Sequence, residues 1–155
     1  MMQTLRRFRG LSGFERGIVL EAATTLPFAW LAVRLLGFRI CKSAFERQRI
    51  IVENSKFPKA GALDTARRIA HLEAVTAANL FFRTSCLEQS LVLCRMLRRR
   101  GMNPGLRIGA RKKANRFEAH AWVELNGIVL DGGEAKHTHF VPFRRFDSSM
   151  ETQTH

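Results

Sequence analysis

Cysteine is scarce in this chain. Only Cys41, Cys86 and Cys94 occur, an odd count with no CxxC pair. This pattern argues against a disulfide framework and against a zinc ribbon, and it favours a reduced, intracellular setting. A chain of 155 residues is long enough to bury a core without disulfides or metals.

Acidic residues are also few. The chain has 13 Asp and Glu against 26 Lys and Arg, a formal net charge of +13. Residues 1–60 carry +7 and residues 61–115 carry +8, whereas residues 116–155 are close to neutral. This excess predicts acidic or polyanionic partners. However, we find no helix-turn-helix spacing, no zinc finger and no aromatic stacking platform, so we expect no nucleic-acid partner.

No uncharged run is long enough to span a bilayer. The longest apolar stretch, Ala22 to Val33, falls short of the roughly 20 residues that a transmembrane helix needs. The basic segment Arg6 to Arg9 precedes it, as in a signal peptide, but no small-residue cleavage site follows. We therefore expect a cytoplasmic protein without membrane contact. The segment is interpreted as a buried amphipathic helix, with a membrane-surface helix as the alternative.

The first part of the chain has helical signals. Ser12 and Glu15 form a capping box, so a long helix should run from there to about Leu36 and stop at Gly37. Pro27 should kink or divide it. Periodicity and stop signals predict further helices over Ser43–Val52, Leu63–Leu80 and Cys86–Arg100.

Alternating patterns replace helical ones after Pro104. Strands are expected over Leu106–Ala110, Phe117–Leu125, Ile128–Asp131 and Phe140–Phe143. Asn126-Gly127 between two of them is a strong hairpin signal. Helices followed by strands predict an α+β fold, with helices packed on a small antiparallel sheet. We expect a helical N-terminal extension (1–60), a core of helices and strands (61–147) and a disordered tail (148–155).

Cys86 is the candidate nucleophile. Ser85 and Glu88 form a second capping box, which makes Cys86 the first residue of a helix. There the helix dipole and the free amides favour a thiolate, and the same amides can bind an oxyanion. Cys94 falls on the apolar side of that helix, so we assign it to the core, together with Cys41.

The hairpin supplies the candidate base. In the predicted register, residue 125 faces 128 and residue 123 faces 130. One face then carries only apolar residues, Ala119 among them, and should be the core side. The other face carries His120, Trp122, Glu124 and Asp131, and places His120 and Asp131 diagonally within reach. Glu134 has the opposite parity and is the weaker orienting acid.

Cys86, His120 and Asp131 make a combination suited to acyl transfer. The imidazole takes the thiol proton, the carboxylate orients the imidazole, and the thiolate attacks a carbonyl. Trp122 is interpreted as a half-covered sheet aromatic that could wall the cleft, and we name Trp122 and Glu124 as candidate substrate-binding residues. We expect no metal and no cofactor.

Four segments carry a family resemblance: Cys86–Leu93, Leu97–Met102, Leu106–Ala110 and Phe117–Glu124. Together they resemble the transglutaminase-like, papain-like core of lasso peptide biosynthesis leader peptidases, the stand-alone cysteine proteases of the microcin-processing type. The opening Leu11–Arg16 is also similar, so the resemblance covers about residues 11–135. The family's catalytic Cys, His and Asp fall on Cys86, His120 and Asp131. Beyond Asp131 the sequence departs from the pattern.

The resemblance implies a specific reaction. The enzyme would cut a ribosomally made precursor peptide between leader and core, before an ATP-dependent lasso cyclase closes the macrolactam. In such systems a small winged-helix protein captures the leader. Residues 1–60 do not resemble that domain, so the resemblance implies a separate recognition protein as partner, with the cyclase as a further candidate partner.

Three other readings remain open. The same residues would serve a transglutaminase-like acyltransferase, because the acyl acceptor alone distinguishes the two reactions. A non-catalytic module that binds an acidic peptide would also suit the positive charge. A metal site would use Cys86 and His120 with His137 and His139, although these residues lack the spacing of known zinc sites.

Overall fold

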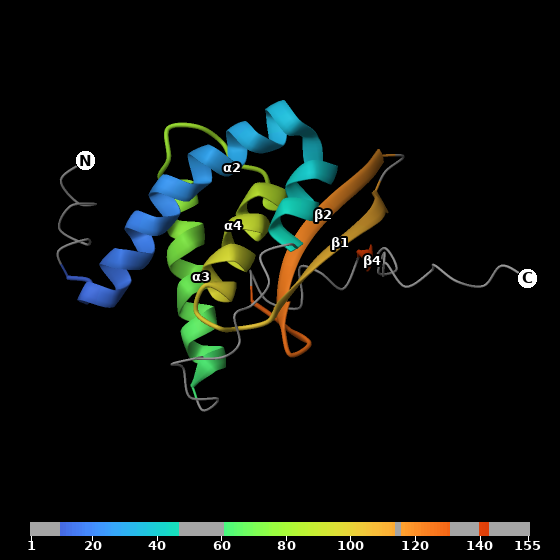
Figure 1. The fold of residues 1–155 in the computed structure, drawn as a ribbon. Coiled ribbons are helices and arrows are strands. Elements are labelled where there is room, and N and C mark those ends of the chain that lie inside the picture. Colours follow the sequence, from blue (N-terminus) through green and yellow to red (C-terminus); the bar gives the residue numbers. More distant parts are fainter. Residues whose placement is uncertain (1–9, 47–60, 114–115, 131–139, 143–155) are drawn as a thin grey trace, which may run out of the picture.

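The computed structural model describes residues 10–46, 61–113, 116–130 and 140–142, with only the backbone for 38–46, 113 and 142. Within these residues, three helices precede four strands (Figure 1). The elements are α2 (Gly13–Glu46), α3 (Ala62–Ala78), α4 (Cys86–Arg98), β1 (Pro104–Lys113), β2 (Arg116–Leu125), β3 (Ile128–Val129) and β4 (Val141–Pro142). The predicted α+β class, with a helical N-terminal part and a small antiparallel sheet, is confirmed. The expected boundary at residue 60 and the tail lie outside the described residues.

Helix α2 begins at the predicted capping box. The Ser12 hydroxyl accepts a hydrogen bond from the Glu15 amide at 3.3 Å, and the Glu15 carboxylate accepts one from the Ser12 amide at 2.8 Å. Gly37 adopts φ 76° and ψ 163° and divides the helix where the stop was predicted. Pro27 was predicted to kink or divide the helix; it does not divide it, because the helix continues through Pro27. The second helical segment runs directly from Gly37 to Glu46 rather than starting at Ser43.

Glu15 also links α2 to α3, and this link should make stability depend on pH. Its carboxylate accepts a hydrogen bond from the Arg68 Nε at 2.7 Å. The bond from the Ser12 amide, followed by that from Arg68, lowers the pKa of Glu15 below its ordinary value of 4.5. A carboxyl group whose pKa is lower in the folded than in the unfolded protein stabilises the fold at pH values above its unfolded-state pKa. This contribution to the free energy of unfolding is lost as the pH falls through the pKa of the folded protein. We expect Glu15→Gln to lower the urea midpoint at pH 7 but not in strong acid. An equal difference at both pH values would contradict this assignment.

The three helices share one core with the inner face of the sheet. Helix α2 packs on α3 and α4, and α4 packs on β1 and β2. The buried residues of α2 recur at helical spacing, as expected for a helix with one buried side. The core includes Ile18, Ala22, Leu26, Ala29, Ile69, Val92, Met96, Leu97, Val123 and Leu125.

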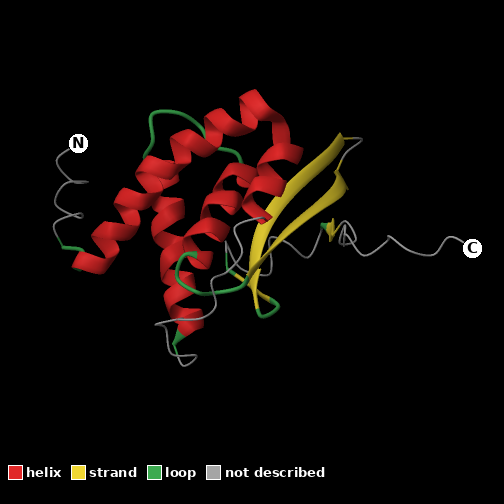
Figure 2. Ribbon diagram, in the orientation of Figure 1, coloured by secondary structure: helices red, strands yellow, loops and turns green. Residues whose placement is uncertain are grey.

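The strands are arranged in the order β3-β2-β1-β4, all antiparallel (Figure 2). Strands β1 and β2 pair along their whole length, from Pro104 opposite Leu125 to Lys113 opposite Arg116. The predicted hairpin register is confirmed, because Leu125 pairs with Ile128. Beyond β3, the Leu130 amide donates to the Val123 carbonyl at 3.0 Å.

The predicted core face of β2 is buried along only part of its length. Ala121, Val123 and Leu125 are buried as expected, whereas Ala119 is exposed. The expectation that Ala119 belongs to the core is therefore wrong. The first five residues of β2 are exposed or half-buried, and full burial begins only at Ala121, so the core covers only the second half of the strand.

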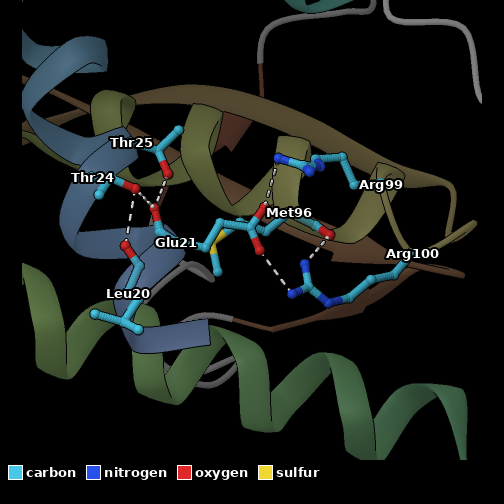
Figure 3. Close-up of polar contacts among 7 residues, drawn as sticks. All are labelled: Leu20, Glu21, Thr24, Thr25, Met96, Arg99 and Arg100. Carbon is cyan, nitrogen blue, oxygen red and sulfur yellow. Dashed lines mark hydrogen bonds and ion pairs between the residues drawn. The ribbon is translucent and has the colours of Figure 1, made fainter. Parts of the chain in front are cut away.

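A half-buried ionic cluster joins α2 to the end of α4 (Figure 3). The Glu21 carboxylate contacts the Arg100 Nη2 at 2.7 Å and the Arg99 Nη1 at 3.4 Å. The Arg100 Nη1 also donates to the Met96 carbonyl at 2.7 Å, which satisfies a carbonyl in the last turn of α4. Arginine near a helix C-terminus is favourable for the helix dipole.

Candidate active site

The nucleophile candidate lies at the capped start of α4. The Ser85 hydroxyl accepts a hydrogen bond from the Glu88 amide at 3.4 Å, and the Glu88 carboxylate accepts one from the Ser85 amide at 2.7 Å. The predicted capping box is therefore confirmed, and Cys86 is the first helical residue. Amides in a first helical turn have no partner within their own helix. The cap uses the Glu88 amide, which leaves those of Cys86 and Leu87 available to a substrate oxygen.

The segment around Cys86 is fixed from two sides. Upstream, the Gln89 Nε2 donates to the Thr84 Oγ1 at 2.9 Å, which ties the preceding loop to the first turn. Downstream, Leu91, Val92, Leu93, Met96 and Leu97 are buried and anchor α4 in the core. A nucleophile on a rigidly packed helix keeps its position better than one on a loop.

The two described thiols differ in exposure. Cys86 is half-buried, whereas Cys94 is only 3% exposed, as the sequence predicted for a core residue. In a Cys41→Ala background, we expect one rapid alkylation by iodoacetamide, at Cys86, and a second only after unfolding. Mass spectrometry of the labelled peptides measures both. Rapid labelling of Cys94 in the folded protein would contradict the described core.

The candidate base, His120, lies in a stack of rings on the sheet. It is half-buried on β2, opposite Gly109 of β1. Its ring stacks on Trp122, with centroids 6.2 Å apart and planes 18° apart. It also contacts the Phe140 ring, which is tilted by 37° with the centroids 5.3 Å apart. The Arg111 guanidinium lies 4.6 Å from the Phe140 ring. These contacts restrict the orientation of the imidazole.

Within that stack, Trp122 is held in place by a hydrogen bond to Glu124. The indole Nε1 of Trp122 donates to one oxygen of Glu124 at 2.9 Å, and the Arg107 Nε donates to the other oxygen at 2.9 Å. Trp122 is only 3% exposed, so the expectation of a half-covered aromatic is wrong. Their assignment as substrate-binding residues stays a prediction. The observed contacts give both residues a part in holding His120.

The sequence did not identify two residues that help to position Trp122 and His120, namely Gly109 and Phe140. A Cβ on Gly109 would lie 3.0 Å from a ring carbon of Trp122 and 2.8 Å from the Val141 carbonyl oxygen, so the absence of a side chain makes room for both. A glycine inside a strand pattern is a signal of such close approach. Phe140 reaches His120 across the sheet from the β4 end, and no local pattern indicates that contact.

Several predicted residues lie outside the described part of the chain: Asp131, Glu134, His137 and His139. Of Cys41, only the backbone is described, inside α2. Within the described residues, no group of three or more His, Cys, Asp or Glu is arranged to hold a metal ion. The roles predicted for Asp131 and Glu134 therefore remain predictions.

The comparisons with known proteins agree with this architecture. A profile of the Transglutaminase-like superfamily matches residues 29–145, which include α3, α4 and all four strands. Comparisons with curated proteins and with solved structures found no match. The matched segment covers more than half of the chain and contains both Cys86 and His120. The chain therefore belongs to the Transglutaminase-like superfamily.

Proposed function

We propose that the protein is a cysteine peptidase in which Cys86 is the nucleophile, His120 the general base and Asp131 the residue that orients His120. The observation that carries this proposal is the position of Cys86, a half-buried thiol at the capped start of a helix that packs on β1 and β2. Support comes from the superfamily, whose fold is typical of cysteine-peptidase and acyltransferase chemistry.

The proposed reaction has two steps. His120 takes the Cys86 proton, and the thiolate forms a C–S bond with the carbonyl carbon of the scissile peptide bond. First-turn amides of α4 stabilise the resulting oxyanion. When the intermediate collapses, the C–N bond breaks and the leaving amine takes the proton from His120. Water, deprotonated by His120, then hydrolyses the thioester and releases the acid.

The proposed substrate is a ribosomally made lasso precursor peptide, cut between leader and core. This rests on the resemblance of the segments around Cys86 and His120 to leader peptidases. We further propose that a separate winged-helix protein presents the leader, that an ATP-dependent cyclase acts on the product, and that all of them are cytoplasmic. A single site gains selectivity for one bond when the rest of the peptide is tethered nearby.

The charge distribution supports an acidic binding partner. Residues 1–60 and 61–115 carry +7 and +8, and the exposed side chains of α3 and of the α4 C-terminus include Arg67 and Arg99. We expect the complex of leader and recognition protein to dock on this basic part. Such docking should weaken with salt, because exposed charges are screened over about 10 Å at 0.1 M.

The test is a cleavage time course on the precursor peptide, with and without the recognition protein, at low and high salt. We expect slow cleavage by the peptidase alone and faster cleavage with the partner, with the acceleration reduced at high salt. Equal rates with and without the partner would contradict the two-protein arrangement. An added primary amine separates the two acyl-transfer chemistries: an amide product formed in place of the free acid would indicate an acyltransferase.

A further inference from the structure

Helix α2 has one side that nothing in the described structure covers. Four large apolar residues on that side are exposed: Leu20 at 58%, Phe28 at 72%, Leu31 at 46% and Leu35 at 73%. At about 100° per residue, these four and Thr24 fall within an arc of about 80° along about four turns. We call these five residues the α2 apolar stripe. Isolated exposed leucines are ordinary, but a continuous row of this length marks an interaction surface.

The stripe offers almost no hydrogen-bonding groups. Its single polar residue, Thr24, turns its hydroxyl back to the Leu20 carbonyl at 2.9 Å and the Glu21 carbonyl at 3.0 Å, as Figure 3 shows. The remaining side chains of the stripe are hydrocarbon. Protein–protein interfaces usually combine an apolar centre with about one hydrogen bond per 100–200 Å². A surface that offers hydrocarbon without donors or acceptors is better matched by the acyl region of a lipid layer.

The acidic and the basic side chains of α2 lie on different sides of the helix. Both glutamates face the protein: Glu15 pairs with Arg68, and Glu21 pairs with Arg99 and Arg100. The two arginines, Arg16 and Arg34, are exposed, and helical geometry places both along the same edge of the stripe. The edge is therefore positive, with no unpaired acid on the helix between Gly13 and Gly37.

Arg34 and Trp30 extend the match. The Arg34 guanidinium lies 4.4 Å from the Trp30 ring. Trp30 in turn packs on Phe82, with ring centroids 5.4 Å apart, so it holds Arg34 at the edge of the stripe. An arginine side chain favours the boundary between lipid headgroups and acyl chains, because its stem is apolar and its end is charged. Anionic headgroups attract basic residues near the surface.

The helix is suited to lying along a membrane rather than crossing it. The segment Gly13–Gly37 is long and apolar enough to cross by length and composition, and 22% of its most apolar part is buried in the protein. However, Ile18, Ala22 and Leu26 on the inner side are fully buried in the core. Crossing would require them to leave that core and Glu21 to lose its ion pairs.

We propose that the α2 apolar stripe docks the protein, side-on, to an anionic lipid surface, with Arg16 and Arg34 at the headgroups. This favours the alternative of a membrane-surface helix over a buried amphipathic helix without membrane contact, because the side opposite the buried one carries the exposed apolar stripe. A second copy of the chain is a poorer occupant, since each copy carries a formal charge of +13.

The test is co-sedimentation of the full chain with lipid vesicles. We expect binding to vesicles of phosphatidylethanolamine with phosphatidylglycerol and little binding to phosphatidylcholine. Raising salt from about 0.1 M to about 1 M should weaken binding, because the Debye length falls from about 10 Å to about 3 Å. Phe28→Glu with Leu35→Glu should lower the partition coefficient for the vesicles at least about tenfold. The double variant removes two apolar side chains that enter the lipid layer and adds two charges that anionic headgroups repel.

The control is a matched pair of exposed apolar residues elsewhere, Val75→Glu with Phe117→Glu, which lie on α3 and β2. This pair adds the same charge and should retain most of the binding. Circular dichroism and urea midpoints check that both variants fold. Absence of the wild type from the anionic pellet, or equal loss of binding in both variants, would overturn the proposal. So would a concentration-dependent dimer, abolished by the stripe variant, in a protein that does not bind vesicles.

Discussion

Replacing Cys86 by alanine should abolish peptide cleavage, and replacing His120 by alanine should nearly do so, with losses in kcat beyond about 10³-fold in each case. The physical reason is that nucleophile and base act as a unit, so that removing either stops formation of the covalent intermediate. Asp131→Ala should leave more activity than either, because the carboxylate only orients the imidazole. The double variant of Cys86 and His120 should lose little more than the single variants, since their effects are not additive.

The matched control is Cys94→Ala, on the same helix. Cys94 is buried and 3% exposed, so its replacement should lower stability without removing activity. Single-turnover cleavage at saturating enzyme separates the chemical step from binding. An active Cys86→Ala protein, or an inactive but folded Cys94→Ala protein, would show that the nucleophile has been misassigned.

The second large effect, on both stability and kcat, is expected for Gly109→Ala. Gly109 has no side chain that could take part in the reaction. A methyl group there would meet the Val141 carbonyl at 2.8 Å and the Trp122 ring at 3.0 Å. Either β4 or the indole must move, and overpacking of this kind costs about 1–3 kcal/mol. Because Trp122 stacks on His120, we also expect a fall in kcat that exceeds any change in KM.

Gly105→Ala is the control for Gly109→Ala. Gly105 lies on the same strand and, four residues away, on the same face, but its added Cβ would meet only the Glu124 carbonyl at 3.9 Å, an ordinary contact. Urea midpoints and single-turnover rates of the two variants give the comparison. Similar values for both would indicate that the ring stack tolerates displacement and does not position His120.

What the sequence predicted well is governed by local interactions. The capping boxes at Ser12 and Ser85 and the two-residue Asn126-Gly127 turn depend on neighbouring residues, and all three occur as predicted. The β3 register follows from that turn. Cys86 was placed at a helix start by the same local signal.

The errors concern contacts between distant segments. Helix-breaking propensity did not decide the conformation at Pro27, because packing of α2 against α3 and α4 favours a continuous helix. Ala119 was assigned to the core because it lies on the same face of β2 as the buried residues Ala121, Val123 and Leu125. The alternation of residues along a strand shows which face points to the core, but not how much of the strand the helices cover. Likewise, the burial of Trp122 depends on Gly109 and the distant β4, whose placement no pattern within β2 encodes.

The ion pairs of Glu21 indicate what would happen to α4 if the N-terminal helix were deleted. The Glu21–Arg100 pair joins residues 79 positions apart, and Ile18, Ala22 and Leu26 lie in the core that α2 shares with α4. Deleting this helix would leave Arg100 without its partner and open a hole against the helix that bears Cys86. Amide protons of α4 should therefore exchange with deuterium in the same cooperative opening as those of α2. In a shortened chain, the end of α4 opposite the thiol should be the first to fray.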